Sequence, residues 1–546
     1  MKKTFAKPLA ALALAAAMLF SSCEGGGSGD GESPTGNSSP KVVNMVMFSS
    51  PDGFISYLGG GGLYTNMAGN LVFEGLTRVD NNFNLLPGLA DSWEISADSL
   101  TYTLHLNEQA KWHDGTPFTS ADVAFTYKLL LNKDFTGSGS PYLINIQGAE
   151  EYKSGAAQDV PGIQIIDPHT IKIVMSTPYA PFLEYNAGTI CILPEHLLKD
   201  VPIADIATAD VRFNPVGTGP AVFNKYVTDQ YVEYDMNKDY YRGTPKFDKL
   251  ILKIMTSDAA LVAFENGELD LTTNTGLGTM PASDLESLKA IAGVKVETYA
   301  TTTVQFISVN VANPVLSDVR FRQAMNYAID KKAIIDNLIS GVGTVSYTSI
   351  PEFSPYYDAS VARKSYDPEK AKALLNEMGW DTSKELVLFV PKGQVVRERM
   401  APLIQSYLKD VGVTVKLEFG EFATLVAEIT KGNYDLAMFG TGAAIIDPNA
   451  AYFNFFHSVQ TRDVGGWNMG HYKNEEFDRL LEEGTATTDV AARKEIYNRI
   501  QAIEADESAF VNIYFESAVG VLSNRMKNVI LSAAGPCWNI VEWDLQ

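Results

Sequence analysis

Alternating apolar and polar positions give a clear local signal in this 546-residue chain. Tyr102, Leu104 and Leu106 are separated by Thr103 and His105, and this period of two is typical of a strand with one buried face. The pattern therefore predicts a strand over residues 102–106, with His105 pointing toward solvent.

A helix is predicted shortly after this strand. Thr119 and Asp122 have the spacing of a capping box, in which each side chain accepts a hydrogen bond from the backbone N–H of the other residue. Val123, Phe125 and Leu129 follow as apolar positions of the helix. We expect these residues to hold the fold and not to contact a ligand.

Helix boundaries are also marked farther along the chain. Ser257 is expected to cap a helix that Gly267 ends, after which residues 269–271 resume a strand. Pro368 directly follows Asp367 and suits the first position of another helix, where its missing N–H has no partner to lose.

The alternation of strand and helix signals continues to the C-terminal end. Residues 304–311 and 510–515 are predicted to be extended, and Ile496, Ile500 and Ile503 mark one face of a helix. Strands that alternate with helices in this way favour an α/β fold.

The N-terminal segment predicts export. Three lysines in the first seven residues precede an apolar run over residues 9–20, which is too short for a membrane-spanning helix and is typical of a secretory signal. Small residues then precede Cys23, as at the cleavage site of a bacterial lipoprotein. We predict a signal peptide over residues 1–22 and a lipid on Cys23, with simple secretion as the alternative.

Residues 23–40 are rich in Gly and Ser and contain almost no apolar side chains. Such a segment cannot bury enough surface to order itself. It is therefore predicted to be a disordered tether between the membrane anchor and the folded part of the chain.

Charge and composition restrict the possible partners. The formal net charge is −22, and it becomes −25 from Cys23 onward because the three lysines leave with the signal. Nucleic acids and anionic lipid surfaces need basic patches, so we expect neither as a binding partner. An apolar fraction of 46% is ordinary for a globular chain, and the ~500 residues after the tether are enough for two or three lobes.

Short motifs in a fixed order carry a family resemblance. Together they resemble the signature of the family 5 solute-binding proteins, the peptide- and nickel-type binding components of ABC importers. The motifs are FEGL at residues 73–76, PGLADSW at 87–93, WHDGTPFTSADV at 112–123, NPVGTGP at 214–220, YYRGTP at 240–245 and DVRFRQAMNYAIDKKAII at 318–335.

The resemblance implies a periplasmic-binding-protein-like α/β fold with two lobes and a hinge. On this basis we place the first lobe at residues 41–75, 210–305 and 506–546. An extra subdomain of that lobe is placed at residues 76–209, and the second lobe at residues 306–505.

The resemblance also implies binding without catalysis. The protein is expected to capture oligopeptides outside the cell and to deliver them to a membrane permease, while a separate ATPase partner hydrolyses ATP. A ligand would favour the closed state in proportion to its higher affinity for that state. We expect a monomer without a cofactor, anchored by lipid to the membrane and facing the exterior or the periplasm.

The ligand question turns on residues 433–456, which depart from the pattern of the peptide binders. Those proteins commonly place an aspartate ahead of an Asp-Pro turn, where it pairs with the free amino terminus of the peptide. Alignment on Asp447-Pro448 puts Ala444 at that position and Thr441 where tryptophan is common. A buried ammonium group without a carboxylate is costly, so the ligand either lacks a free amino terminus or finds its counter-charge elsewhere, for example on Asp447.

Candidate ligand contacts come from loops on both sides of the expected cleft. The first lobe contributes Ser49, Ser50 and Tyr57. The opposite side contributes Thr441, Ala444, Asp447, Asn454 and Trp467.

Two other functions stay open. The first is the same transport role for an oligosaccharide or another uncharged solute, which fits Ala444 and the aromatic residues Tyr57, Tyr452, Phe453, Phe456 and Trp467. The second is a secreted hydrolase or a surface adhesion protein, which would need a paired nucleophile and base or an array of repeats. The sequence has no CxxC, HExxH, GxSxG or phosphate-loop motif, and its six histidines are scattered, so we predict no catalytic residue and no metal site.

Two smaller questions concern pairing. Cys191 and Cys537 lie far apart in the sequence, so their spacing does not decide whether they form a disulfide. Arg320 and Arg322 are expected to pair with nearby acids and not with a ligand.

Overall fold

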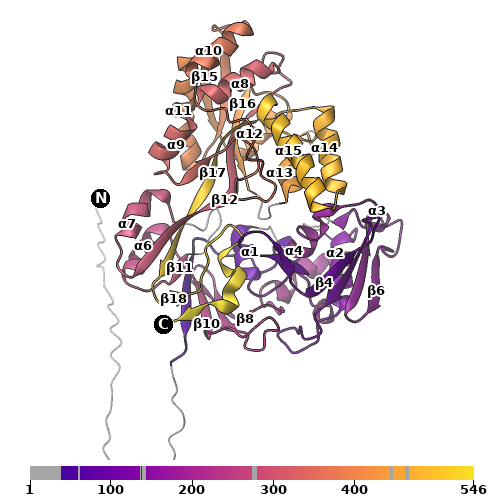
Figure 1. The fold of residues 1–546 in the computed structure, drawn as a ribbon. Coiled ribbons are helices and arrows are strands. Elements are labelled where there is room, and N and C mark those ends of the chain that lie inside the picture. Colours follow the sequence, from indigo (N-terminus) through magenta and orange to yellow (C-terminus); the bar gives the residue numbers. More distant parts are fainter. Residues whose placement is uncertain are drawn as a thin grey trace, which may run out of the picture. The chain divides into compact units, whose positions relative to one another are not determined.

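The computed structural model describes residues 39–58, 62–135, 137, 143–272, 280–442, 447–461, 466–508 and 510–546. Within it, Pro40–Gln546 form one compact unit. The elements of this unit are labelled in Figure 1.

The main sheet has eleven strands. Strands β14, β15 and β16 are parallel to one another, whereas β12 and β17 are antiparallel. Its order is β15 (Thr414–Gly420), β14 (Glu385–Pro391), β16 (Leu436–Thr441), β12 (Val294–Val309), β17 (Phe510–Ser523), β11 (Leu271–Thr272), β1 (Val42–Met47), β10 (Lys249–Ile254), β9 (Tyr231–Met236) and β8 (Ala221–Val227), with β13 (Gly343–Val345) paired to β17.

Three smaller sheets complete the strands of the described residues. One has four antiparallel strands, in the order β4 (Ala90–Ile95), β5 (Thr101–Leu106), β7 (Thr170–Val174) and β6 (Ile163–Asp167). Two pairs, β2 (Thr77–Val79) with β3 (Leu85–Pro87) and β18 (Met526–Lys527) with β19 (Asp544–Leu545), make up the rest.

Fifteen α-helices lie between these strands along the described part of the chain. They are α1 (Leu63–Gly69), α2 (Ser120–Leu131), α3 (Ala149–Ser154), α4 (Asn186–Thr189), α5 (Glu195–Leu198), α6 (Ser257–Glu265), α7 (Leu285–Lys289), α8 (Val319–Ala328), α9 (Lys331–Leu338), α10 (Pro368–Glu377), α11 (Val395–Asp410), α12 (Phe422–Thr430), α13 (Pro448–Phe456), α14 (Glu475–Ala486) and α15 (Val490–Glu507).

Local sequence signals predicted several of these elements. Strand β5 covers the predicted alternation, and the His105 side chain is 42% exposed. The capping box at the start of α2 is confirmed, with Thr119 N–H donating to Asp122 Oδ2 at 2.9 Å. Helix α10 begins at Pro368 as predicted.

Two local predictions were wrong. The cap of α6 is Thr256, one residue before the predicted Ser257, and its hydroxyl accepts from the Ala259 N–H at 3.3 Å. Arg320 pairs with Asp318 at 2.6 Å as expected, but the guanidinium of Arg322 donates to backbone carbonyls, including that of Ser317 at 2.6 Å. Burial explains this difference, because Arg322 is 5% exposed and its Nε reaches the Glu507 carbonyl at the C-terminal end of α15, where carbonyls lack helical donors.

Strands β12 and β17 run through the middle of Figure 1 and join two parts of the main sheet. At one end Leu522 of β17 pairs with Leu271 of β11, and at the other Val304 of β12 pairs with Thr441 of β16. We call the part around β1 and β8–β10 the first lobe and the part around β14–β16 the second lobe. Regular pairing of β12 with β17 breaks between Ala300 and Val304.

Each lobe has its own core. The first-lobe core includes the four-stranded sheet, so Tyr102 and Leu104 share one hydrophobic cluster with Val43. In the second lobe, successive residues of β12 point to opposite faces: Phe306 enters one cluster and Ile307 the other. The exact chain boundaries of the lobes stay a prediction.

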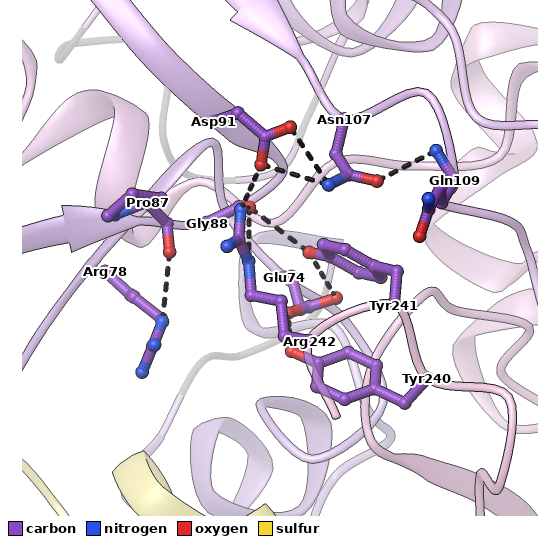
Figure 2. Close-up of polar contacts among 10 residues, drawn as sticks. All are labelled: Glu74, Arg78, Pro87, Gly88, Asp91, Asn107, Gln109, Tyr240, Tyr241 and Arg242. Atoms are coloured by element: carbon purple, nitrogen blue, oxygen red, sulfur yellow. Dashed lines mark hydrogen bonds and ion pairs between the residues drawn. The ribbon is translucent and has the colours of Figure 1, made fainter. Parts of the chain in front are cut away.

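Four of the six family motifs meet around Glu74 and Arg242 in the first lobe, and Figure 2 shows most of these contacts. The Glu74 carboxylate accepts hydrogen bonds from the hydroxyls of Tyr240 at 2.5 Å, Thr218 at 3.0 Å and Tyr241 at 3.1 Å. Burial raises the pKa of Glu74, and the three hydroxyls and Arg242 oppose that rise. FEGL, NPVGTGP and YYRGTP therefore meet at one carboxylate.

Arg242 extends this network to a fourth motif, PGLADSW. Its Nε donates to the Gly88 carbonyl at 2.9 Å, and its Nη2 pairs with Asp91 at 2.9 Å. Asp91 also accepts from Asn107, which follows β5. The network thereby fastens the four-stranded sheet to the rest of the first lobe.

We predict that Glu74→Ala destabilises the first lobe. The change leaves the hydroxyls of Tyr240 and Thr218 without their acceptor, and hydrogen bonds to a charged group contribute about 1.5–3 kcal/mol. The free energy of unfolding, measured by urea denaturation, should fall by about that amount. Glu94→Ala is the control, because its side chain is 78% exposed and an exposed substitution changes stability by less than about 0.5 kcal/mol. Equal effects of the two substitutions would contradict the prediction.

Candidate functional site

The carboxyl ends of the parallel strands β14, β15 and β16 lie together at one end of the second-lobe sheet. This end is the one at which β16 meets the irregular part of β12. The register places Pro391 beside Gly420, and Thr441 beside Val304 of β12. Ligands of open α/β sheets bind outside the carboxyl ends of parallel strands. Residues that follow these strands are therefore the first candidates for a binding site.

Arg397 lies in the first turn of α11, just after β14, and its guanidinium reaches β12 and β16. Its Nε donates to Gln305 Oε1 at 2.8 Å, and Gln305 Nε2 donates to Glu516 Oε1 at 2.7 Å. A Cβ on Gly440 would lie 2.5 Å from Arg397 Nη2, so the guanidinium rests against the backbone of β16. Gly440 is the residue that allows this approach.

The charges of this group are only partly matched. Arg397 and Glu516 are both half-buried and are joined through the Gln305 amide, and no direct ion pair links the two within the described part of the chain. Burial lowers the pKa of Arg397 and raises the pKa of Glu516, while each group opposes the shift of the other. No acceptor among the described residues bonds the Arg397 Nη atoms, so they can receive an anionic group.

A second charged group lies at the start of α13. Asp447 caps this helix and forms two hydrogen bonds with Arg493 of α15, at 2.8 and 3.0 Å. Their side chains are 1% and 3% exposed. Arg493 also donates to the Gly484 carbonyl at 2.8 Å and lies over the rings of Tyr356 and Tyr497. The pair is buried and bidentate, and both partners belong to the second lobe.

Glu184 of the first lobe adjoins this pair. It lies between the short helix η3 (Ala180–Phe182) and α4, and the charges of Asp447 and Arg493 both act on its carboxyl group. Burial and the charge of Asp447 raise the pKa of Glu184 to about 7, while Arg493 opposes the rise. The charge of one guanidinium thus acts on carboxyl groups from different lobes.

Two further contacts join the lobes on the same side. The hydroxyls of Ser99 and Thr488 are 2.8 Å apart, and the rings of Phe83 and Phe353 stack with their centroids 5.8 Å apart. The structure therefore represents a state in which the first and second lobes touch.

The predicted first-lobe contacts have different surroundings. Ser49 is exposed after β1, and the Ser50 hydroxyl donates to Asp229 Oδ1 at 2.5 Å. Tyr57 is only 7% exposed, and its hydroxyl donates to the Cys191 carbonyl. Of these three, Ser49 alone has an exposed side chain that the structure leaves for a ligand.

The predicted second-lobe contacts gather around α13. Thr441 ends β16, Asn454 is exposed on α13, and the Trp467 N–H donates to the Asn454 carbonyl at 3.1 Å. Trp467 is 38% exposed and packs near Phe455, with 6.4 Å between ring centroids. Asp447 is near them, but Arg493 already occupies both its oxygens.

Two predicted sites cannot be placed. Ala444 and Cys23 lie outside the residues that the structure describes, so the amino-terminus position and the lipid attachment stay predictions.

The aromatic residues that favoured a sugar are divided between core and surface. Tyr452 and Phe456 are 0% and 1% exposed and belong to a core cluster of the second lobe. The Tyr452 hydroxyl donates to the buried carboxylate of Glu504 at 2.6 Å. Trp467 is the member of the predicted set that keeps an exposed ring surface.

Cys191 and Cys537 are both free thiols in the structure, which answers the question that their spacing left open. Within the described ranges, no group of three or more His, Cys, Asp or Glu side chains is arranged to hold a metal ion. None of the helices in the described part of the chain is both long and apolar enough to cross a bilayer.

A groove of about 1360 Å³ opens at the opposite end of the second-lobe strands, lined by Asn310, Arg322, Tyr434 and Glu507 among others. Its buried charged groups already have internal partners. Arg322 donates to backbone carbonyls, and Glu507 accepts from Tyr472 at 2.7 Å. We therefore favour the edge near Arg397 as the binding site.

Sequence reasoning did not identify Arg397, Gln305, Glu516 or Glu184. One signal was available for Arg397, because it directly follows a buried strand and stands in the first turn of a helix, where the helix dipole disfavours a cation. Such a position suggests a role beyond helix formation. The other three residues come together only through the pairing of distant strands and lobes.

Comparisons with known proteins identify the family. The model of the bacterial extracellular solute-binding proteins, family 5 (middle), matches residues 84–463. The oligopeptide-binding protein AppA of Bacillus subtilis is 27% identical over 495 residues, covering 87% of this chain and 86% of the relative. Heme-binding protein A of Haemophilus influenzae is 28% identical over 552 residues, covering 96% and 97%.

A solved structure extends the likeness to the fold. The ABC transporter substrate-binding protein CtaP of Listeria monocytogenes has a TM-score of 0.79 at 27% identity, covering 93% of this chain and 99% of that one. The mixed α/β fold is therefore that of the periplasmic solute-binding proteins. This chain belongs to family 5 of the bacterial extracellular solute-binding proteins.

Proposed function

We propose that this protein is the binding component of an ABC importer that captures oligopeptides outside the cell and delivers them to a membrane permease. Family membership supports the transport role, and relatives named for oligopeptides support the ligand class. In this role the protein binds without chemistry, and a separate ATPase supplies the energy.

The observation that supports the ligand proposal is the guanidinium of Arg397, which lies beside Gly440 without a carboxylate in direct contact. Arg397 offers its Nη atoms at the carboxyl ends of the strands, and Glu516 lies one amide away. A peptide has a carboxylate at one terminus and an ammonium at the other. A neutral sugar would leave both half-buried charges without a counter-charge in direct contact, which is costly.

We propose that Arg397 receives the peptide carboxylate and that Ser49, Thr441, Asn454 and Trp467 line the rest of the site. Tyr57 and Asp447 are less suited to direct contact, because their polar atoms bond Cys191 and Arg493. The ligand enters while the lobes are apart and favours their contact by binding both of them.

A second candidate keeps the transport role but changes the ligand to an oligosaccharide or another uncharged solute. The exposed ring of Trp467 favours it, because aromatic faces suit apolar sugar faces and need no ligand charge. The heme-binding relative is a reminder that ligands differ among such proteins.

Export and anchoring complete the proposal. Residues 1–22 would direct the chain out of the cytoplasm, and a lipid on Cys23 would hold the folded part at the membrane through the tether of residues 23–40. The protein would act there as a monomer. These assignments rest on sequence composition alone.

Calorimetric titration tests the ligand class. We expect heat of binding when the purified protein is titrated with a mixture of short oligopeptides, and none with a mixture of oligosaccharides. Heat from the oligosaccharides and none from the peptides would replace the first proposal with the second.

Arg397→Gln tests the carboxylate receptor. Loss of a hydrogen-bonded charge partner costs about 1.5–3 kcal/mol, so affinity for a binding peptide should fall about 10–100-fold. Amidation of the peptide's carboxyl end should weaken binding to the wild type similarly and should weaken binding to the variant no further. Arg399→Gln, two residues along α11 at an exposed position, is the matched control. Additive losses from the variant and the amide would contradict direct contact.

Cys23→Ser tests the anchor. A diacylated cysteine is the hydrophobic group that would retain this otherwise acidic protein at a membrane, so the variant should move from the membrane fraction to the soluble fraction. Mass spectrometry of the wild type should find lipid on the new N-terminal cysteine. Cys191→Ser is the control, and equal membrane retention of all three proteins would exclude a Cys23 anchor.

A further inference from the structure

The turn between β2 and β3 carries a phenyl ring to the second lobe. Phe83 stacks on Phe353, with 5.8 Å between the ring centroids and 25° between the ring planes. Phe353 belongs to the second lobe, because Ile350 and Tyr356 on either side of it enter a core cluster of that lobe. The residues next to Phe83 in its own turn are exposed. This ring therefore reaches across the lobe contact.

Phe83 is buried without being part of a core. It is 8% exposed, yet neither it nor Phe353 belongs to any of the hydrophobic clusters formed by the described residues. Separating the lobes would take Phe353 away from the ring and expose both to water. Burial of apolar surface is favourable in proportion to its area, so this contact favours the state in which the lobes touch.

The turn holds Phe83 in the position that the contact needs. Phe83 has a φ of 63°, in the left-handed region that residues other than Gly rarely adopt. The carboxylate of Asp80 stabilises this turn, because it accepts from the backbone N–H groups of Asn82 at 2.8 Å and Asn84 at 2.9 Å. The Asn84 side chain donates to the same carboxylate at 2.9 Å. All these groups belong to the first lobe, so the turn can keep its shape when the lobes are apart.

The base of the same hairpin is fastened as well. Arg78 of β2 donates from Nε to the Pro87 carbonyl of β3 at 3.0 Å, as Figure 2 shows, and from Nη1 to the Trp538 carbonyl at 3.2 Å. The network of Glu74 and Arg242 begins at the next residue, Gly88. A ring on a hairpin that is fixed at its base and its tip loses little freedom when it meets its partner.

The turn between β4 and β5 repeats this arrangement. Ser99 has a φ of 59°, and Asp98 Oδ1 accepts from the Leu100 N–H at 3.1 Å and from the Ser96 hydroxyl at 2.5 Å. The Ser99 hydroxyl lies 2.8 Å from that of Thr488, which stands between α14 and α15 of the second lobe. Two residues in the left-handed conformation thus meet the second lobe, each in a turn that an aspartate organises.

We propose that these two turns, residues 80–84 and 96–100, form a clasp that holds the lobes together before a ligand binds and so raises the affinity of the site. A ligand that binds both lobes has an apparent affinity reduced by the fraction of molecules whose lobes are apart. The clasp therefore acts on binding through this fraction. It goes beyond the proposed transport role and rests on it only in requiring that the lobes separate to admit a ligand.

Small-angle X-ray scattering of the ligand-free protein tests the clasp. Burial of a Phe side chain corresponds to about 10–100-fold in an equilibrium constant, so Phe83→Ala should lower the ratio of compact to extended molecules by about that factor. Each lobe should stay folded, because Phe83 is outside the cores. Phe353→Ala should act similarly, and the double variant should lower the ratio little further, since either change removes the same contact. Ile166→Ala, at a 53% exposed position of β6, is the control.

A disulfide between the turns and the second lobe gives a second measurement. Ser99→Cys combined with Thr488→Cys places two thiols where the hydroxyls lie 2.8 Å apart. We expect oxidation of this ligand-free variant to form the bond, located by peptide mass spectrometry, and Phe83→Ala in the same background to slow its formation. The clasp would be overturned by an extended wild type, by Phe83→Ala scattering like the wild type, or by failure of the disulfide to form.

Asp80→Ala tests whether the turn must be held in shape. It keeps both rings but releases the backbone of residues 82 and 84, so the compact fraction should fall here too. For any peptide that the wild type binds, calorimetry should show affinity falling by the same factor as the compact fraction in both Asp80→Ala and Phe83→Ala. Unchanged affinity despite a smaller compact fraction would contradict the link to binding. If no peptide binds, the oligopeptide proposal fails, while scattering and the disulfide still decide the clasp.

Discussion

Two strands that belong to both lobes constrain everything else in this structure. β12 and β17 pair with the first-lobe sheet at one end and with the second-lobe sheet at the other. We therefore expect a movement of the lobes to bend this pair and not to slide the lobes apart. The bend has a natural place where regular pairing stops between Ala300 and Val304, because an irregular ladder has fewer hydrogen bonds to distort. The same pair brings Gln305 and Glu516 to the site.

Some buried charged groups have all their hydrogen-bond partners within the fold, and others have only some of them. Glu504 is satisfied, because Ser349, Tyr452 and Asn512 all donate to it inside the second lobe. Arg397 and Glu184 are only partly satisfied, and both lie where the two lobes approach each other. Incomplete pairing is costly in a static core but is useful at a surface that must bind and release.

The family motifs serve the scaffold more than the ligand. Side chains of four of the six motifs meet at Glu74 and Arg242, far along the chain from the candidate site at Arg397. A carboxylate that accepts three hydroxyl donors tolerates little change in any of them. Such motifs identify the fold for this reason. Ligand specificity then depends on other residues, which make fewer contacts within the scaffold.

The sequence by itself determined the features that depend on near neighbours: the one-sided strand at Thr101–Leu106, the capping box of α2, the start of α10 and the family. Spacing of a few residues is enough for these, because their hydrogen bonds and side-chain periodicity are local. It did not yield Arg397 with Gln305 and Glu516, nor the role of Arg493 in occupying Asp447. Only the tertiary structure decided these contacts, since strand pairing and lobe contact join residues that the chain separates, and burial then sets their charge.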